Sequence, residues 1–202
     1  ALHQAGQGAA SRAAFAEAEA MQAERQPSYD RLYSLRGYQY CALLLGEVEG
    51  IEDGGLGIGH GRSEIGEAQV AQGVAVCRAV RQRVLQVINR RQPLPTYVLL
   101  DQSLDLLTLG RTYLLEAQLS GAGPADGGWP QAATALQQSV ALLRRSGNQD
   151  DLPRGLLALA ELGRAWAAVA GAEGRGFDSA QPPPAVPPRE ALLTQAERAL
   201  EE

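Results

Sequence analysis

The stretch LLTLGRTY, Leu106–Tyr113, carries the pattern that decides the fold. A large apolar residue is followed four positions later by glycine, and an aromatic residue comes three positions after that. The same pattern recurs as YSLRGYQY at Tyr33–Tyr40 and as LAELGRAW at Leu159–Trp166. A glycine inside a helix costs about 1 kcal/mol against alanine, so its repetition must serve packing. We expect each glycine to let a neighbouring helix approach closely, with the aromatic residues filling the space beside it.

The segments between these three carry a second pattern, a stripe of residues spaced four and then three positions apart. The stripes are Ser11, Phe15 and Ala18; Ala132, Leu136 and Ser139; and, in a weaker form, Val80, Val84 and Val87. This spacing returns to one face of a helix. Small residues at the ends of a stripe permit close packing, so the two patterns together predict helices that pack in pairs.

The composition fits a helical chain that forms one domain, 1–202. Hydrophobic residues make up 45% of the chain and aromatic residues only 5%, so the core must consist of Leu, Ala and Val, and Leu and Ala are strong helix formers. Periodicity and breakers predict helices at about 9–25, 29–45, 67–91, 96–119, 130–145, 152–170 and 189–202. Segments rich in glycine or proline, at about 46–66 and 171–188, are predicted to be flexible inserts.

The alternation of the two patterns resembles the tetratricopeptide repeat (TPR) family. The marker glycines Gly37, Gly110 and Gly163 are 73 and 53 residues apart, whereas the family period is about 34 residues. The chain therefore looks like the divergent arrays of large multidomain bacterial proteins. The resemblance implies an all-α fold, in which about seven helices form antiparallel hairpins stacked as an α-solenoid.

The resemblance also implies a function, which is non-catalytic protein–protein interaction as a scaffold or sensor segment. In this family the first helix of each hairpin lines a concave face that binds a peptide or a partner domain. The matching positions here are Tyr38, Arg111 and Arg164, and Arg31 is expected further up the same helix face as Tyr38. Arginine side chains and a tyrosine can hold an acidic or C-terminal peptide. The alternative is that these arginines pair with neighbouring Glu or Asp. The Lys/Asn clamp for chaperone tails is not reproduced.

The chain begins at Ala1 without Met and ends within a helical pattern, so we expect it to be part of a longer protein. Other domains of that protein are candidate partners. A second hypothesis is structural self-association, since the end of a repeat array exposes apolar faces; the product would be a homodimer or a stack.

Several other kinds of function lack support in the sequence. The net charge is −5 and all 18 basic residues are arginine, without the cation cluster that nucleic acid requires. A signal peptide and an 18-residue apolar stretch are both missing, so no membrane association and a cytoplasmic location are expected. His60 follows a glycine-rich stretch, but neither a metal site nor a phosphate loop has its full set of residues, and no cofactor is expected.

Two pairs of residues leave chemical alternatives open. Asp101 and Asp105 lie one helical turn apart and could do acid/base work, although a solvated or partner-facing helix edge is the simpler interpretation. Cys41 and Cys77 fall inside apolar helical patterns and are predicted to be buried free thiols, with a disulfide as the alternative. Because no nucleophile–base set occurs, the chain is not expected to be an enzyme.

Overall fold

Six α-helices and a short 3₁₀ helix make up the part of the chain that the computed structural model describes, which is residues 7–55, 66–91, 97–123 and 128–172. The elements are α1 (Gly8–Arg25), η1 (Pro27–Tyr29), α2 (Ser34–Gly55), α3 (Glu67–Arg91), α4 (Leu99–Ser120), α5 (Trp129–Ser146) and α6 (Leu152–Ala172). The prediction of an all-α fold is confirmed. The predicted helix at 189–202 and residues 173–188 of the insert predicted at about 171–188 lie outside the described residues, whereas residues 171 and 172 belong to α6.

The second helix corrects the sequence prediction at both ends. It begins at Ser34 and not near residue 29, because Pro27–Tyr29 forms η1. It continues to Gly55, through the first half of the segment predicted to be a flexible insert. Val48 is only 1% exposed, whereas a side chain added at Gly46 or Gly50 would meet nothing within 4 Å. The glycines therefore occupy open positions on a helix whose other face is held by packing.

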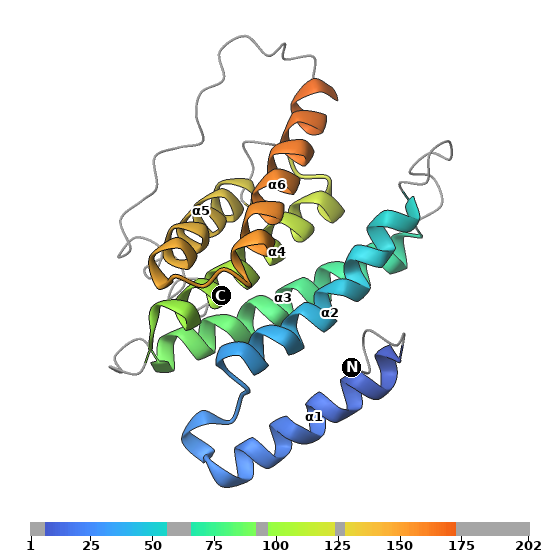
Figure 1. Cartoon of the computed structure of the whole chain (residues 1–202). Coiled ribbons are helices and arrows are strands. Elements are labelled where there is room, and N and C mark those ends of the chain that lie inside the picture. The colour runs from blue at the N-terminus through green and yellow to red at the C-terminus, as the bar shows by residue number, and fades with distance from the viewer. Residues whose placement is uncertain (1–6, 56–65, 92–96, 124–127, 173–202) are drawn as a thin grey trace.

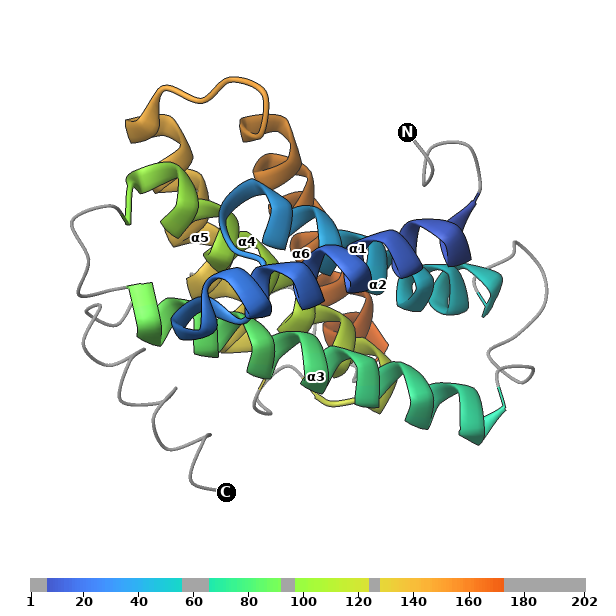
Figure 2. The same ribbon diagram turned by 90° about the horizontal axis from the view of Figure 1, so that it is seen from below.

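The helices are arranged as a stack in which chain neighbours pack against each other (Figure 1). Successive helices run in alternating directions, so α2, α4 and α6 point one way and α1, α3 and α5 point the other way. Helix α4 packs not only against α3 and α5 but also against α2 and α6. Seen from below, α1 lies across one edge of this stack, beside α2 (Figure 2).

Two apolar clusters form the core, and α4 contributes to both. The first joins α4, α5 and α6 and includes Tyr38 of α2; the second joins α2, α3 and α4 and includes Ala135 of α5. Trp129 is fully buried in the first cluster, donates its indole N–H to the Ala122 carbonyl at 3.0 Å and meets Trp166 edge-on. The stripes at Val80, Val84, Val87 and at Ala132, Leu136, Ser139 are buried as predicted.

Only one of the three marker glycines meets another helix. A Cβ at Gly110 would lie 2.5 Å from Cγ of Leu136 on α5, so this glycine does admit the neighbouring helix. At Gly37 a Cβ would lie 2.5 Å from the carbonyl oxygen of Leu32, just upstream of the same helix, and at Gly163 it would meet nothing within 4 Å. The expectation of a helix approaching at all three glycines is therefore wrong for Gly37 and is not met by the described residues at Gly163.

Candidate functional site

Tyr38, Arg111 and Arg154 come together from three helices. Tyr38 on α2 is 6% exposed, and the Arg154 guanidinium of α6 lies 5.9 Å from the centre of its ring. Arg111 on α4 forms an ion pair with Glu49 of α2, and Arg154 donates to Asp151 at 2.6 Å. We call this set, Tyr38, Glu49, Arg111, Asp151 and Arg154, the α2–α4–α6 face.

The electrostatics of this face centre on the tyrosine. Burial raises the pKa of Tyr38, and the positive charges of Arg111 and Arg154 partly oppose that rise. Arg154 keeps 58% of its side chain exposed and Arg111 keeps 19%. The phenol ring is therefore buried next to two guanidinium groups, and the guanidinium of Arg154 is accessible from solvent.

The structure brings together two of the four residues predicted to bind a partner, Tyr38 and Arg111. Arg164 is exposed on α6, at the position that follows Gly163. Arg31 is not on the helix of Tyr38 at all, because α2 begins at Ser34, so its predicted place further up that helix is wrong. Sequence reasoning missed Arg154, since nothing in the chain shows that residue 154 lies against residue 38.

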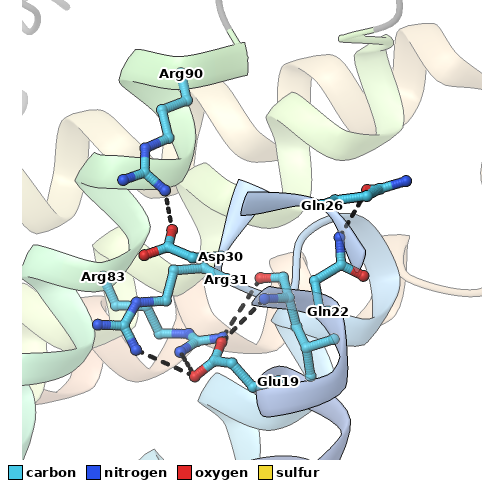
Figure 3. Close-up of polar contacts among 8 residues, drawn as sticks. Glu19, Gln22, Gln26, Asp30, Arg31, Arg83 and Arg90 are labelled. Carbon is cyan, nitrogen blue, oxygen red and sulfur yellow. Dashed lines mark hydrogen bonds and ion pairs between the residues drawn. The ribbon is translucent and has the colours of Figure 1, made fainter. Parts of the chain in front are cut away.

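Arg31 belongs to a different set of polar contacts, centred on Glu19 of α1 (Figure 3). Arg83 of α3 donates to Glu19 Oε2 at 2.7 Å, Arg31 reaches the same oxygen at 3.2 Å, and the Leu32 N–H donates to Oε1 at 3.0 Å. Burial opposes ionisation of Glu19, but these hydrogen bonds and charges outweigh it, and the pKa of Glu19 lies below its ordinary value. This seam ties α1 to α3, and it shows Arg31 paired with an acid, as Arg111 is.

A second ion pair extends the seam toward the end of α3. Arg90 pairs with Asp30, and the hydrogen bond from Arg90 lowers the pKa of Asp30 (Figure 3). Both side chains are about two-fifths exposed. Solvent screens such a pair, so it stabilises little by itself.

Asp101 and Asp105 do not form a solvated helix edge, so that interpretation is wrong. The two residues are 5% and 6% exposed, at the seam of α3 and α4. Arg91 donates to Asp101 Oδ2 at 2.6 Å and Ser34 donates to Oδ1, while the Tyr97 hydroxyl donates to Asp105 Oδ2 at 2.9 Å. We call Ser34, Arg91, Tyr97, Asp101 and Asp105 the buried polar cluster.

Within the buried polar cluster, the carboxyl group of Asp105 has a raised pKa. Burial raises the pKa of Asp105 to about 7, although the hydrogen bond from Tyr97 and the charge of Arg91 lower it. The cavity beside Asp105 is also lined by Tyr38, Cys41 and Arg83 and has a volume of about 10 Å³. That volume holds about one water molecule. In this arrangement the cluster connects α2, α3 and α4.

Sequence reasoning could have found this cluster from its spacing. Asp101, Asp105, Thr108 and Thr112 recur at intervals of four, three and four along α4, a helix rich in leucine, and all four are buried. A polar stripe on such a helix indicates buried, hydrogen-bonded side chains and not a wet edge. The partners Arg91 and Tyr97 cannot be identified from spacing.

The remaining candidate groups give simple outcomes. Cys41 and Cys77 are buried thiols and not a disulfide, as predicted, and burial raises the pKa of Cys41 to about 11. His3 and His60 lie outside the described residues. Within the part of the chain that the structure describes, no group of three His, Cys, Asp or Glu side chains could hold a metal ion. None of the described helices is long and apolar enough to cross a membrane.

Comparison with protein-family models, with curated proteins and with solved structures finds no match to this chain.

Proposed function

We propose that the chain is a TPR-like α-solenoid segment that acts as a non-catalytic protein–protein interaction module in the cytoplasm. Two arrangements support the solenoid: successive helices alternate in direction, and α4 packs against both α2 and α6. Alternate helices that lie side by side form the continuous surface on which stacked hairpins bind their partners.

The observation that carries the proposal is the convergence of Tyr38, Arg111 and Arg154 on the α2–α4–α6 face. Helix α6 extends this face, because Arg154, Leu157, Glu161 and Arg164 recur at intervals of three and four. Leu157, between Arg154 and Glu161, is 64% exposed. An exposed leucine beside an arginine is suited to a partner segment that offers both carboxylate and apolar groups.

The ion pairs on this face do not prevent such binding. Arg111 is 19% exposed and its partner Glu49 is 36% exposed, so their ion pair is partly screened by solvent. An incoming carboxylate can compete with Glu49 for Arg111 and bind it through two parallel N–H donors. The partner we propose is an acidic peptide segment or an acidic surface of another domain.

Fluorescence anisotropy with a labelled hexaglutamate peptide tests the proposal, with hexaglutamine as the neutral probe. We expect hexaglutamate to bind the full chain more tightly than hexaglutamine. The double variant Arg111→Ala, Arg154→Ala should weaken binding at least about tenfold, which is 1.4 kcal/mol. The control Arg25→Ala, Arg145→Ala removes the same charge from the exposed ends of α1 and α5. Equal loss in both double variants, or equal binding of the two peptides, would contradict the proposed site.

Self-association is a second candidate function, and one observation favours it. Leu156 of α6 is 42% exposed on an apolar side of the helix that no described residue covers. A second copy could cover it. Light scattering across a dilution series measures this directly, because a dimer that forms through α6 must dissociate on dilution.

A further inference from the structure

One side of α6 is apolar and uncovered along about three turns. Leu156, Ala160, Gly163 and Ala167 recur at intervals of four, three and four, and all are exposed. A Cβ at Gly163 would meet nothing within 4 Å. We call these four residues the open α6 face; it is a different side of the helix from Arg154, Leu157 and Arg164.

The corresponding positions on α4 show which kind of element packs on such a side. Aligning Gly163 with Gly110 places the open α6 face on Ser103, Leu107, Gly110 and Leu114. On α4 these positions are buried; Ser103 and Leu107 have no exposed surface and Leu114 is 3% exposed. Helix α5, which follows α4 in the chain, packs there: Ser139 donates to the Ser103 carbonyl at 2.7 Å, and Leu136 fills the space at Gly110.

The chain carries a segment suited to the same role after α6. In residues 189–202, REALLTQAERALEE, helical spacing places Leu192, Leu193, Ala196, Ala199 and Leu200 on one side and nearly all polar residues on the other. Its four glutamates and two arginines give it a net charge of −2. Arg164 borders the open α6 face, where it can pair with a glutamate of this acidic segment.

The chain between α6 and residues 189–202 is long enough to let this segment reach the open α6 face. Residues 173–188 separate α6 from this segment, and 16 extended residues reach about 50 Å. Helix α6 has 21 residues, which corresponds to about 30 Å. The chain can therefore return along α6 and run antiparallel to it, as α5 does on α4.

We propose that residues 189–202 form an amphipathic helix that docks on the open α6 face of the same chain. Docking removes from solvent the apolar surface that would otherwise promote self-association. Arg154 and Leu157 stay accessible on the α2–α4–α6 face, because they project from another side of α6.

Amide hydrogen exchange of the full chain, at a concentration where light scattering shows a monomer, tests the docking. We expect amides of 193–202 to exchange at least about 100-fold more slowly than in an unstructured chain. The double variant Leu193→Glu, Leu200→Glu should abolish this protection. The control Thr194→Glu, Gln195→Glu adds the same charge on the polar side and should keep it. Unprotected amides in the monomer, or protection that grows with concentration, would overturn the proposal, the latter in favour of a second copy.

A pair of glycine variants gives an independent test. The direction of the change in melting temperature distinguishes a covered α6 face from a bare one. Gly50 is exposed within α2 with nothing near its Cβ position, so Gly50→Ala should raise the melting temperature by about 2–4 °C. If the open α6 face is covered, Gly163→Ala places a methyl group against the docked helix and should lower the melting temperature. An increase equal to that of Gly50→Ala would show that the face is bare and would overturn the proposal.

Discussion

Helices α1 and α5 carry similar stripes but are attached to the stack in different ways. On α5 the residues Ala132, Leu136 and Ser139 are fully buried, and Leu136 fills the space left by Gly110. On α1 only Ser11 is buried, and Ala18, the last member of its stripe, is exposed. The contacts of α1 are instead a stacked pair of rings, Phe15 on Tyr40 at 5.1 Å, and ion pairs to α2 and α3.

Helix α5 is held to the stack by apolar burial, whereas the attachment of α1 depends on charged groups. Apolar burial scales with the area removed from water and is insensitive to ionisation. The attachment of α1 depends on the charge of Glu19, since Arg83, which it neutralises, is only 9% exposed. We therefore expect α1 to detach under conditions that leave the α4–α5 pair intact, as a local opening of lower free energy.

Deleting the buried leucine should have the largest effect. Leu136→Ala leaves a cavity against Gly110 in the first apolar cluster, and such changes cost about 2–5 kcal/mol. We expect about 4 kcal/mol in urea unfolding, with helices α2 to α6 unfolding together. The control is Leu35→Ala, where the side chain is 44% exposed; its cost should stay below about 1 kcal/mol. Similar losses of unfolding free energy in the two variants would show that the packing of Leu136 against Gly110 does not hold α5.

Removing the partly buried carboxylate of Glu19 from α1 should cost somewhat less and act locally. Glu19→Ala leaves Arg83 without its charge partner, at a cost of about 3 kcal/mol. Amide exchange should accelerate in α1 before it does in α4 or α5. Glu17→Ala, on the exposed side of α1, is the matched control and should change little. A uniform acceleration throughout the stack would contradict the separate opening of α1.

The pH dependence follows from the direction of the shift. The pKa of Glu19 is lowered in the folded chain from its ordinary value of 4.5. Its stabilisation is therefore complete above pH 4.5 and is lost as the pH falls through the folded pKa. Protection of the α1 amides should fall over that acidic range in the natural chain, and Glu19→Ala should be insensitive to it.

The sequence was sufficient for the fold class and for most helix limits, because these depend on local spacing. The predicted limits of α3 match the structure, and those of α5 and α6 differ by one or two residues. The error at α2 has a physical cause: Gly46 and Gly50 weaken local helix propensity, while burial of Leu45 and Val48 against other helices stabilises the segment. Local spacing does not report that tertiary contribution.

The site was predicted in part, for the same reason. The repeated pattern correctly aligned Tyr38 with Arg111, which do meet. It could not identify Arg154, whose role depends on where the first turn of α6 lies relative to α2. Gly110 and Gly163 illustrate the limit, because the same local pattern is covered by α5 in one case and by no described residue in the other.

Asp105 lies at the seam of α3 and α4, between the compared helices α1 and α5. Its ionisation should have an intermediate effect on the free energy of unfolding. Its pKa is raised in the folded chain from the ordinary 3.8 to about 7. The neutral carboxyl group thus stabilises fully below pH 3.8, and this contribution is lost as the pH rises to about 7. The shift corresponds to at most about 4 kcal/mol; with relaxation of Tyr97 and Arg91 we expect about 2 kcal/mol.

Urea unfolding at pH 5 and pH 8 measures this contribution. Asp105→Asn cannot ionise, so the natural chain should lose stability relative to the variant between the two pH values. The comparison is internal, since Glu19 and the other carboxylates titrate in both proteins. An equal change in the two proteins would show that Asp105 is already ionised at pH 5.

The smallest effect is expected at the other ion pair of α1. Arg12 and Glu47 have side chains that are 49% and 41% exposed, so Arg12→Ala should cost about 0.5 kcal/mol or less in urea unfolding. The exchange of α1 amides should change far less than in Glu19→Ala, which removes the contacts of Glu19 with both Arg83 and Arg31. A cost near that of Glu19→Ala would contradict the distinction between partly buried and exposed pairs. The expected result would assign the attachment of α1 to the contacts of Glu19 and not to the exposed pair at Arg12.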